Sequence, residues 1–163
     1  MNDIQHFAKL TKDIKFAMFT TVSRDGTLRS RPMTLQQNEF DGTLWFFADR
    51  WSHLASDIGD GSRVNLSFAD IKNNSYLSAS GQADVVFDKA KERELWNPFY
   101  KAWFPEGLED TKLCLIKVTV ESADYWESPS SPLIHLVGFA KAVLTGQRPA
   151  PGLLSDTGHL NLN

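Results

Sequence analysis

The chain has 163 residues, of which 42% are hydrophobic and 12% aromatic, and its formal net charge is −3 at pH 7. This composition is typical of one globular domain and argues against a disordered chain, a general nucleic-acid-binding surface or a surface for anionic membranes. The single cysteine, Cys114, excludes an internal disulfide, and no apolar stretch approaches the roughly 20 residues that cross a bilayer. Residues 1–10 lack the pattern of a signal peptide, so we expect a cytoplasmic protein.

The first third of the chain has the pattern of a helix followed by strands. Apolar residues at helical spacing predict a helix over residues 3–12, with Asn2 or Asp3 as its N-cap. Runs rich in β-branched and aromatic residues predict three strands, at residues 15–23, 27–36 and 43–48. The Asp25-Gly26 turn predicts that the first two strands pair antiparallel.

Two features of these strands are unusual. Pro32 cannot donate a hydrogen bond to a neighbouring strand, so it belongs at a sheet edge or a bulge. The strand at residues 43–48 is apolar on both faces, since Trp45 and Phe47 alternate with Leu44 and Phe46. We therefore expect this strand to be covered on both sides, with a ligand or a partner chain as part of the cover.

The rest of the chain continues the alternation of strands and short helices. Strands are predicted at residues 64–68, 75–87, 113–121 and 123–127, and helices at 51–58, 88–95, 98–103 and 132–144. Gly81 lies within a strand and predicts a bulge or a tight bend, and Asp88 is a suitable helix cap. We expect a domain over residues 1–146 and an extended or disordered tail over residues 147–163, too polar and short to build a core.

About six strands joined mostly by short turns predict a mainly β fold with flanking helices. Successive hairpins imply an antiparallel sheet that is closed or nearly closed as a small barrel. None of the four histidines has a metal-ligand partner at helical spacing, so no metal site is expected. Cys114 lies on a core-facing alternation, which favours packing over nucleophilic catalysis.

The segment from residue 27 to residue 55 carries the clearest sign of a ligand site. Arg29 and Arg31 lie two apart on one strand and therefore share a face, which is either a solvated face or a phosphate site. Ser52 and His53 open a helix, and Ser52 either simply caps that helix or helps its free amides to bind a phosphate.

Aromatic residues gather later in the chain, around Pro98 and at Tyr125-Trp126. Most aromatic residues of this kind pack in a core, but they also stack on flat rings and line interfaces. The cluster around Pro98 comprises Trp96, Tyr100, Trp103 and Phe104. Because apolar residues cover both faces of one strand, we expect a homodimer with a ligand at the junction.

Five segments, at residues 20–33, 42–53, 76–86, 95–107 and 118–146, together resemble the general stress protein 26 group of the pyridoxamine 5′-phosphate oxidase-like, FMN-binding split-barrel family. The motifs SRPM, WFFADRWSH, WNPFYKAWFP and YWESPSS carry this resemblance. It implies a six-stranded antiparallel split barrel that forms a homodimer, with FMN bound at the dimer interface.

The resemblance also implies roles for residues at matching positions. Arg31 would meet the FMN phosphate, and Pro32 and Met33 would run beside the flavin ring. Phe47 and Ala48 match positions of the third strand that touch the flavin.

Further matching positions lie later in the chain. Ser52 and His53 match the start of the phosphate-binding helix, and Tyr76 and Trp126 match positions that approach the flavin from the partner subunit. The family usually has lysine where this chain has Leu54 and commonly threonine at position 48, so this chain has fewer phosphate contacts.

These observations predict an FMN-binding protein of oxidoreductase type, whose substrate and small-molecule redox partner the sequence does not identify. One alternative is a flavin carrier or sensor without turnover, because no general acid or base is evident near the proposed site. Another is a split barrel that uses a deazaflavin or a haem, with His53 as the haem ligand.

Overall fold

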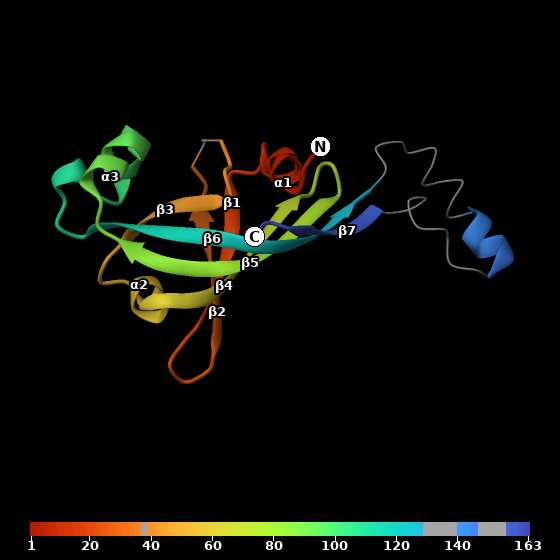
Figure 1. Cartoon of the computed structure of the whole chain (residues 1–163), viewed down its shortest axis with the longest axis horizontal. Helices are drawn as coiled ribbons and strands as arrows, with labels where there is room; N and C mark the ends of the chain where they lie inside the picture. The colour runs from red at the N-terminus through yellow and green to blue at the C-terminus, as the bar shows by residue number, and fades with distance from the viewer. Residues whose placement is uncertain (37–38, 129–139, 147–155) are drawn as a thin grey trace.

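The computed structural model describes residues 1–36, 39–128, 140–146 and 156–163, and in this part of the chain seven strands form one antiparallel sheet (Figure 1). The strands are β1 Phe16–Val22, β2 Leu28–Thr34, β3 Thr43–Asp49, β4 Asp60–Asp70, β5 Ser75–Val86, β6 Leu113–Glu127 and β7 Asp156–Asn161. Their order in the sheet is β2-β1-β4-β5-β6-β3, with β7 paired to the second half of β6. The sheet curls into a half-barrel, which confirms the predicted antiparallel split barrel.

The helices are short and flank the sheet. They are α1 Asp3–Thr11, α2 His53–Ile58 and α3 Lys89–Leu95, with 3-10 turns η1 Pro98–Ala102 and η2 Gly107–Glu109. Most of the predicted helix at residues 132–144 lies outside the described residues. The described residues 140–145 are helical. Within the described part of the chain, no helix is both long and apolar enough to cross a membrane.

Local hydrogen bonds explain where these elements begin. The Asn2 side chain accepts from the Gln5 amide at 2.8 Å, and the Gln5 side chain accepts from the Asn2 amide, which makes a capping box for α1. Asp88 caps α3 through the amides of Ala90 and Lys91. The predicted caps are therefore confirmed, with Asn2 rather than Asp3 at the first helix.

The β1–β2 hairpin forms as its turn residues predict. The Asp25 carboxylate accepts from the Thr27 amide at 3.0 Å, and Gly26 has a φ of 82°, which favours glycine. The predicted irregularity at Gly81 is a shift in the β5–β6 register between Ser80 and Gly81. A Cβ at Gly81 would overlap the Thr119 carbonyl oxygen, so only glycine allows the two strands to approach there.

The strand β3 separates two apolar clusters, as its sequence predicts. Phe46 is fully buried in the main core, where its ring lies 5.4 Å from the Phe19 ring. Phe47 faces the other way and packs against Tyr100 and Trp96, at ring distances of 4.7 and 5.6 Å. Both faces of β3 are thus covered, and the segment from the end of α3 to η2, residues 95–108, supplies much of the second cover.

The end of the chain differs from the prediction, which was an extended or disordered tail that contributes nothing to the core. Strand β7 pairs with β6 and is a seventh strand in addition to the six predicted. Leu160 is 3% exposed and belongs to the main core. The Asn161 amide also donates to Asp3 at 2.8 Å, so β7 is joined to the start of α1.

Candidate functional site

The two end strands of the sheet, β2 and β3, come close together without pairing, and a cavity of about 630 Å³ lies between them. We call it the edge cavity. It is lined by Phe16, Arg31, Pro32, Met33, Thr34, Phe47, Ala48, Asp49, Ser52, His53, Leu54, Tyr100, Trp103 and Phe104. The cavity thus occupies the split of the barrel, and its size is typical of a small-molecule site.

The backbone of β2 is turned toward this cavity. The Leu35 amide donates to the Lys15 carbonyl at 2.9 Å, and antiparallel pairing alternates, so every second residue of β2 bonds to β1. Pro32 and Thr34 alternate with the residues of β2 that bond to β1, so the backbone groups of Pro32 and Thr34 point away from β1. Pro32 lies on an edge strand, and its missing N–H costs the sheet no hydrogen bond.

The same alternation applies to β3 on the other side of the cavity. The Arg50 amide donates to the Lys112 carbonyl at 2.8 Å, so Phe47 and Asp49 turn their backbone groups away from β6. Two rows of backbone donors and acceptors therefore border the cavity. Such groups are suited to bind the polar edges of a flat heterocycle.

Arg31 lies at one end of the cavity, held by two neighbours, Thr21 and Asp57. Its Nη1 donates to Thr21 Oγ1 at 2.7 Å, and its Nη2 lies 3.6 Å from Asp57 Oδ2. The same carboxylate oxygen accepts from the hydroxyls of Thr21 at 2.9 Å and Ser23 at 3.1 Å. A guanidinium has five N–H donors, so this arrangement orients Arg31 and leaves donors for an anionic ligand.

Asp57 is the charged residue of this network that the sequence did not reveal, and its partners Thr21 and Ser23 were not predicted either. Its side chain is 10% exposed and reaches Arg31 because α2 packs against β1. No local pattern marks Asp57, since its partners Thr21 and Ser23 lie 36 and 34 residues earlier. The carboxylate offsets part of the positive charge that Arg31 brings to the cavity.

The start of α2 completes the polar end. Ser52 Oγ accepts from the Ala55 amide at 3.2 Å, so this hydroxyl caps the helix, and His53 beside it is exposed. With only six residues, α2 contributes a small dipole. Leu54 borders the cavity and is 5% exposed within the main core, where it adds apolar packing and no charge.

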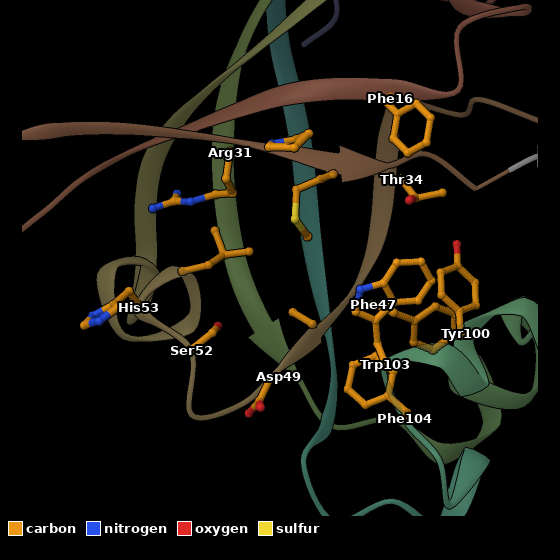
Figure 2. Close-up of a pocket in the computed structure, with 14 residues that line it drawn as sticks. Phe16, Arg31, Thr34, Phe47, Asp49, Ser52, His53, Tyr100, Trp103 and Phe104 are labelled. Atoms are coloured by element: carbon orange, nitrogen blue, oxygen red, sulfur yellow. The ribbon is translucent and has the colours of Figure 1, made fainter.

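Aromatic side chains form the opposite end of the cavity. Figure 2 shows Phe16, Tyr100, Trp103 and Phe104 on one side and Arg31 with the α2 start on the other. Burial raises the pKa of the Tyr100 hydroxyl, which keeps it protonated at neutral pH. The cavity therefore has one cationic end and one aromatic end.

The sequence predictions for the site have three outcomes. Eight of the ten predicted cofactor-binding residues border the edge cavity, from Arg31 on β2 to Leu54 on α2. Tyr76 and Trp126 do not; they form a cross-strand pair on β5 and β6, and both are exposed. Phe16, Thr34, Asp49 and the aromatic residues of the η1 region were not among the predicted residues, although the aromatic cluster around Pro98 was evident in the sequence.

Two other arginines near these segments do not reach the cavity. Arg29 shares a face with Arg31 but is exposed and not in the lining. Arg50 turns away, with its guanidinium 4.5 Å from the Phe87 ring centre. Nor does the described part of the chain group three or more His, Cys, Asp or Glu side chains closely enough to hold a metal ion.

Comparisons with known proteins agree with this architecture. A family model described as pyridoxamine 5′-phosphate oxidase like matches residues 2–150. Protein bli-3 of Neurospora crassa is 32% identical over 157 residues, which cover 90% of this chain and 74% of that protein.

Solved structures show the same fold. A protein of Jannaschia sp. CCS1, described as a candidate general stress protein 26, has a TM-score of 0.76 at 24% identity and covers 99% of both chains. The general stress FMN/FAD binding protein of Xanthomonas citri has a TM-score of 0.69 at 30% identity and covers 78% of this chain and 89% of that one. With the family match over residues 2–150 and this split-barrel fold, the chain belongs to the pyridoxamine 5′-phosphate oxidase-like family, in its general stress protein 26 group.

Proposed function

We propose that this protein binds FMN in the edge cavity and acts as a flavin-dependent oxidoreductase. The observation that carries the proposal is the cavity between β2 and β3, with a hydrogen-bonded arginine at one end and an aromatic wall at the other. FMN has the matching form, a phosphate joined by a flexible chain to a flat ring. The Xanthomonas citri relative is described as an FMN/FAD binding protein.

The residues that would hold FMN divide by chemistry. Arg31, Ser52 and His53 would bind the phosphate, with charge-assisted bonds from the guanidinium as the strongest contact. The backbone edges at Pro32 and Phe47 would bind the ring. The bound flavin would supply the electron transfer, while the protein orients it and excludes water.

FMN binding is tested by the absorption spectrum of freshly purified protein and by titration of flavin-free protein. Bound flavin should give its visible bands, and added FMN should lose fluorescence with a dissociation constant in the micromolar range or below. Absence of both effects would refute FMN as the ligand. A deazaflavin or a haem, which would give different spectra, is distinguished in the same measurement.

A second function, a flavin carrier or sensor without turnover, is favoured by one observation. Among the described residues at the aromatic end of the cavity (Phe16, Tyr100, Trp103 and Phe104), Tyr100 alone is titratable, and its raised pKa makes it a poor base. Reduction of the FMN-loaded protein by NADH or NADPH, followed with several electron acceptors, separates the two functions. Sustained turnover supports the oxidoreductase, and its absence supports the carrier.

The outer face of the sheet supports the proposal that two copies assemble. Alternate residues of β1 point outward beside their partners in β2, and the large side chains of this patch are apolar and exposed. It includes Phe16, Met18, Val22 and Leu28. Exposed apolar patches of this kind are typical of protein interfaces.

Tyr76 and Trp126 lie on the same outer face. Met18 pairs with Ser67, Ser67 pairs with Ser78, and Tyr76 is two residues from Ser78 on β5. In a symmetric dimer, each copy would offer both aromatic residues to the edge cavity of its partner. Light scattering should show a dimer, and Met18→Asp should give monomers with weaker FMN binding; a monomeric wild-type protein would exclude this assembly.

A further inference from the structure

A second cavity of about 550 Å³ adjoins the edge cavity, between the end of β2 and the α3–η1 segment. We call it the side cavity. Phe16, Thr34 and Tyr100 border both cavities, so Tyr100 forms part of the wall between them. A ligand in the side cavity would therefore lie next to a ligand in the edge cavity.

The side cavity has aromatic side chains in its walls, of which Tyr100 is held in place by packing. Tyr100 is 8% exposed, and its ring lies 4.7 Å from Phe47 and 6.0 Å from Trp96. Phe99, on the outer side, is exposed and lies 5.3 Å from the Trp103 ring. Aromatic side chains favour stacked or edge-to-face contacts, so the walls select a flat aromatic ligand.

A hydrogen-bond donor is available at the Tyr100 wall. Gln36 Nε2 donates to Tyr100 Oη at 2.7 Å, so the hydroxyl acts as acceptor in this bond and keeps its own proton. Among the described residues no acceptor is bonded to that proton. Burial raises the pKa of Tyr100, so the proton stays on the oxygen at neutral pH. The matching group on a ligand is a carbonyl oxygen.

Among the described residues that line the side cavity, Lys15 is the cation at its rim. Glu94 and Lys15 both border it, but Glu94 Oε1 is bound by Lys91 Nζ at 2.8 Å. Lys15 is exposed and forms no ion pair with any described residue. An anionic substituent on the ligand would be attracted to Lys15.

We propose that the side cavity binds a planar aromatic carbonyl compound with an anionic substituent, such as a charged quinone. The role of this compound as electron acceptor or donor of the flavin rests on the proposed function. The binding of the compound to the side cavity does not. The flat walls, the tyrosine hydroxyl and the free lysine each select one part of this ligand.

The probe is anthraquinone-2-sulfonate, titrated by calorimetry into flavin-free protein and into protein saturated with FMN. We expect one probe per chain in both cases. Tyr100→Phe, which keeps the ring, should weaken binding roughly three- to ten-fold, as expected for one hydrogen bond. Lys15→Gln should weaken it roughly two- to five-fold, with the loss diminishing at high salt. Lys72→Gln, an exposed lysine in the β4–β5 turn, is the matched control and should change nothing.

Anthracene-2-sulfonate lacks the carbonyls and should bind more weakly, with no response to Tyr100→Phe. The proposal is overturned if the anthraquinone does not bind at millimolar concentration, if Tyr100→Phe and Lys15→Gln leave binding unchanged, or if FMN displaces the probe. Because the titration of flavin-free protein needs no flavin, a protein that fails to bind FMN refutes the proposed function without affecting this test.

Discussion

Replacing Arg31 by alanine should weaken FMN binding and also destabilise the flavin-free protein, for two separable reasons. The substitution removes the cation proposed to meet the phosphate. It also leaves Asp57 as a carboxylate that is 10% exposed and has lost its arginine, with only the Thr21 and Ser23 hydroxyls as donors.

The effect on binding follows from the loss of charge-assisted hydrogen bonds, which contribute about 1.5–3 kcal/mol. The dissociation constant for FMN should therefore rise roughly 10- to 150-fold. Riboflavin has no phosphate, so its affinity should change little. Arg29→Ala is the matched control, because Arg29 lies on the same strand but is exposed and does not border the edge cavity.

The effect on stability is smaller than for a fully buried ion pair, where loss of one partner costs about 3–5 kcal/mol. Here the guanidinium is 22% exposed, the two charges are 3.6 Å apart, and two hydroxyls still donate to Asp57. We expect a loss of about 1–2 kcal/mol, or a fall in Tm of about 2–8 °C for a chain of this size.

Adding Asp57→Asn to Arg31→Ala should restore the Tm without restoring FMN binding, because it removes the unpaired carboxylate but returns no cation. Fluorescence titration and thermal unfolding of the flavin-free variants measure the two effects. Equal losses of FMN and riboflavin affinity would show that Arg31 does not contact the phosphate. A double variant as unstable as Arg31→Ala would show that Asp57 is not the source of the instability.

Three further predictions concern buried or closely packed positions. The native protein should resist thiol reagents at mildly alkaline pH, because Cys114 is fully buried and burial raises its pKa to about 12; labelling should appear only on unfolding in denaturant, and rapid labelling of native protein would contradict this. Gly81→Ala should cost about 1–3 kcal/mol in a urea titration, since the new Cβ would overlap the Thr119 carbonyl; an unchanged midpoint would show that the strands can separate at no cost. Gly158→Val should detach β7, because atoms added there would meet the Tyr125 ring, and hydrogen exchange of the β7 amides should accelerate; wild-type protection would refute this.

The sequence predicts most elements because their causes are local. The turn at Asp25-Gly26, the cap at Asn2 and the irregularity at Gly81 depend on residues close by in the chain or on the backbone freedom of glycine. Alternating apolar residues likewise show which strands have one buried face and which, like β3, have two. These signals are sufficient for an antiparallel sheet and for the order of strands and helices as far as β6, but not for β7.

The edge cavity could be predicted only in part. Arg31, Pro32 and Ser52 lie within one short segment of the sequence, which marks them as candidates for one site. Strands β2 and β3 do not pair with each other, however, so it is the curl of the sheet that brings these residues to one cavity. Tyr100 reaches Gln36 across 64 residues of sequence, and this contact exists only because η1 packs on the second face of β3. Propensity and periodicity carry no information on such a contact.

The sequence by itself determined a mainly β chain with a basic, proline-interrupted strand next to an aromatic one. Tertiary structure alone decided that β2 and β3 become the two open edges of one sheet, with a cavity between them. It also decided that Asp57 forms an ion pair with Arg31, that Tyr100 lies between two cavities, and that β7 pairs with β6. The physical reason is that turns and caps form from neighbouring groups, whereas these contacts form only when the curled sheet brings distant segments together.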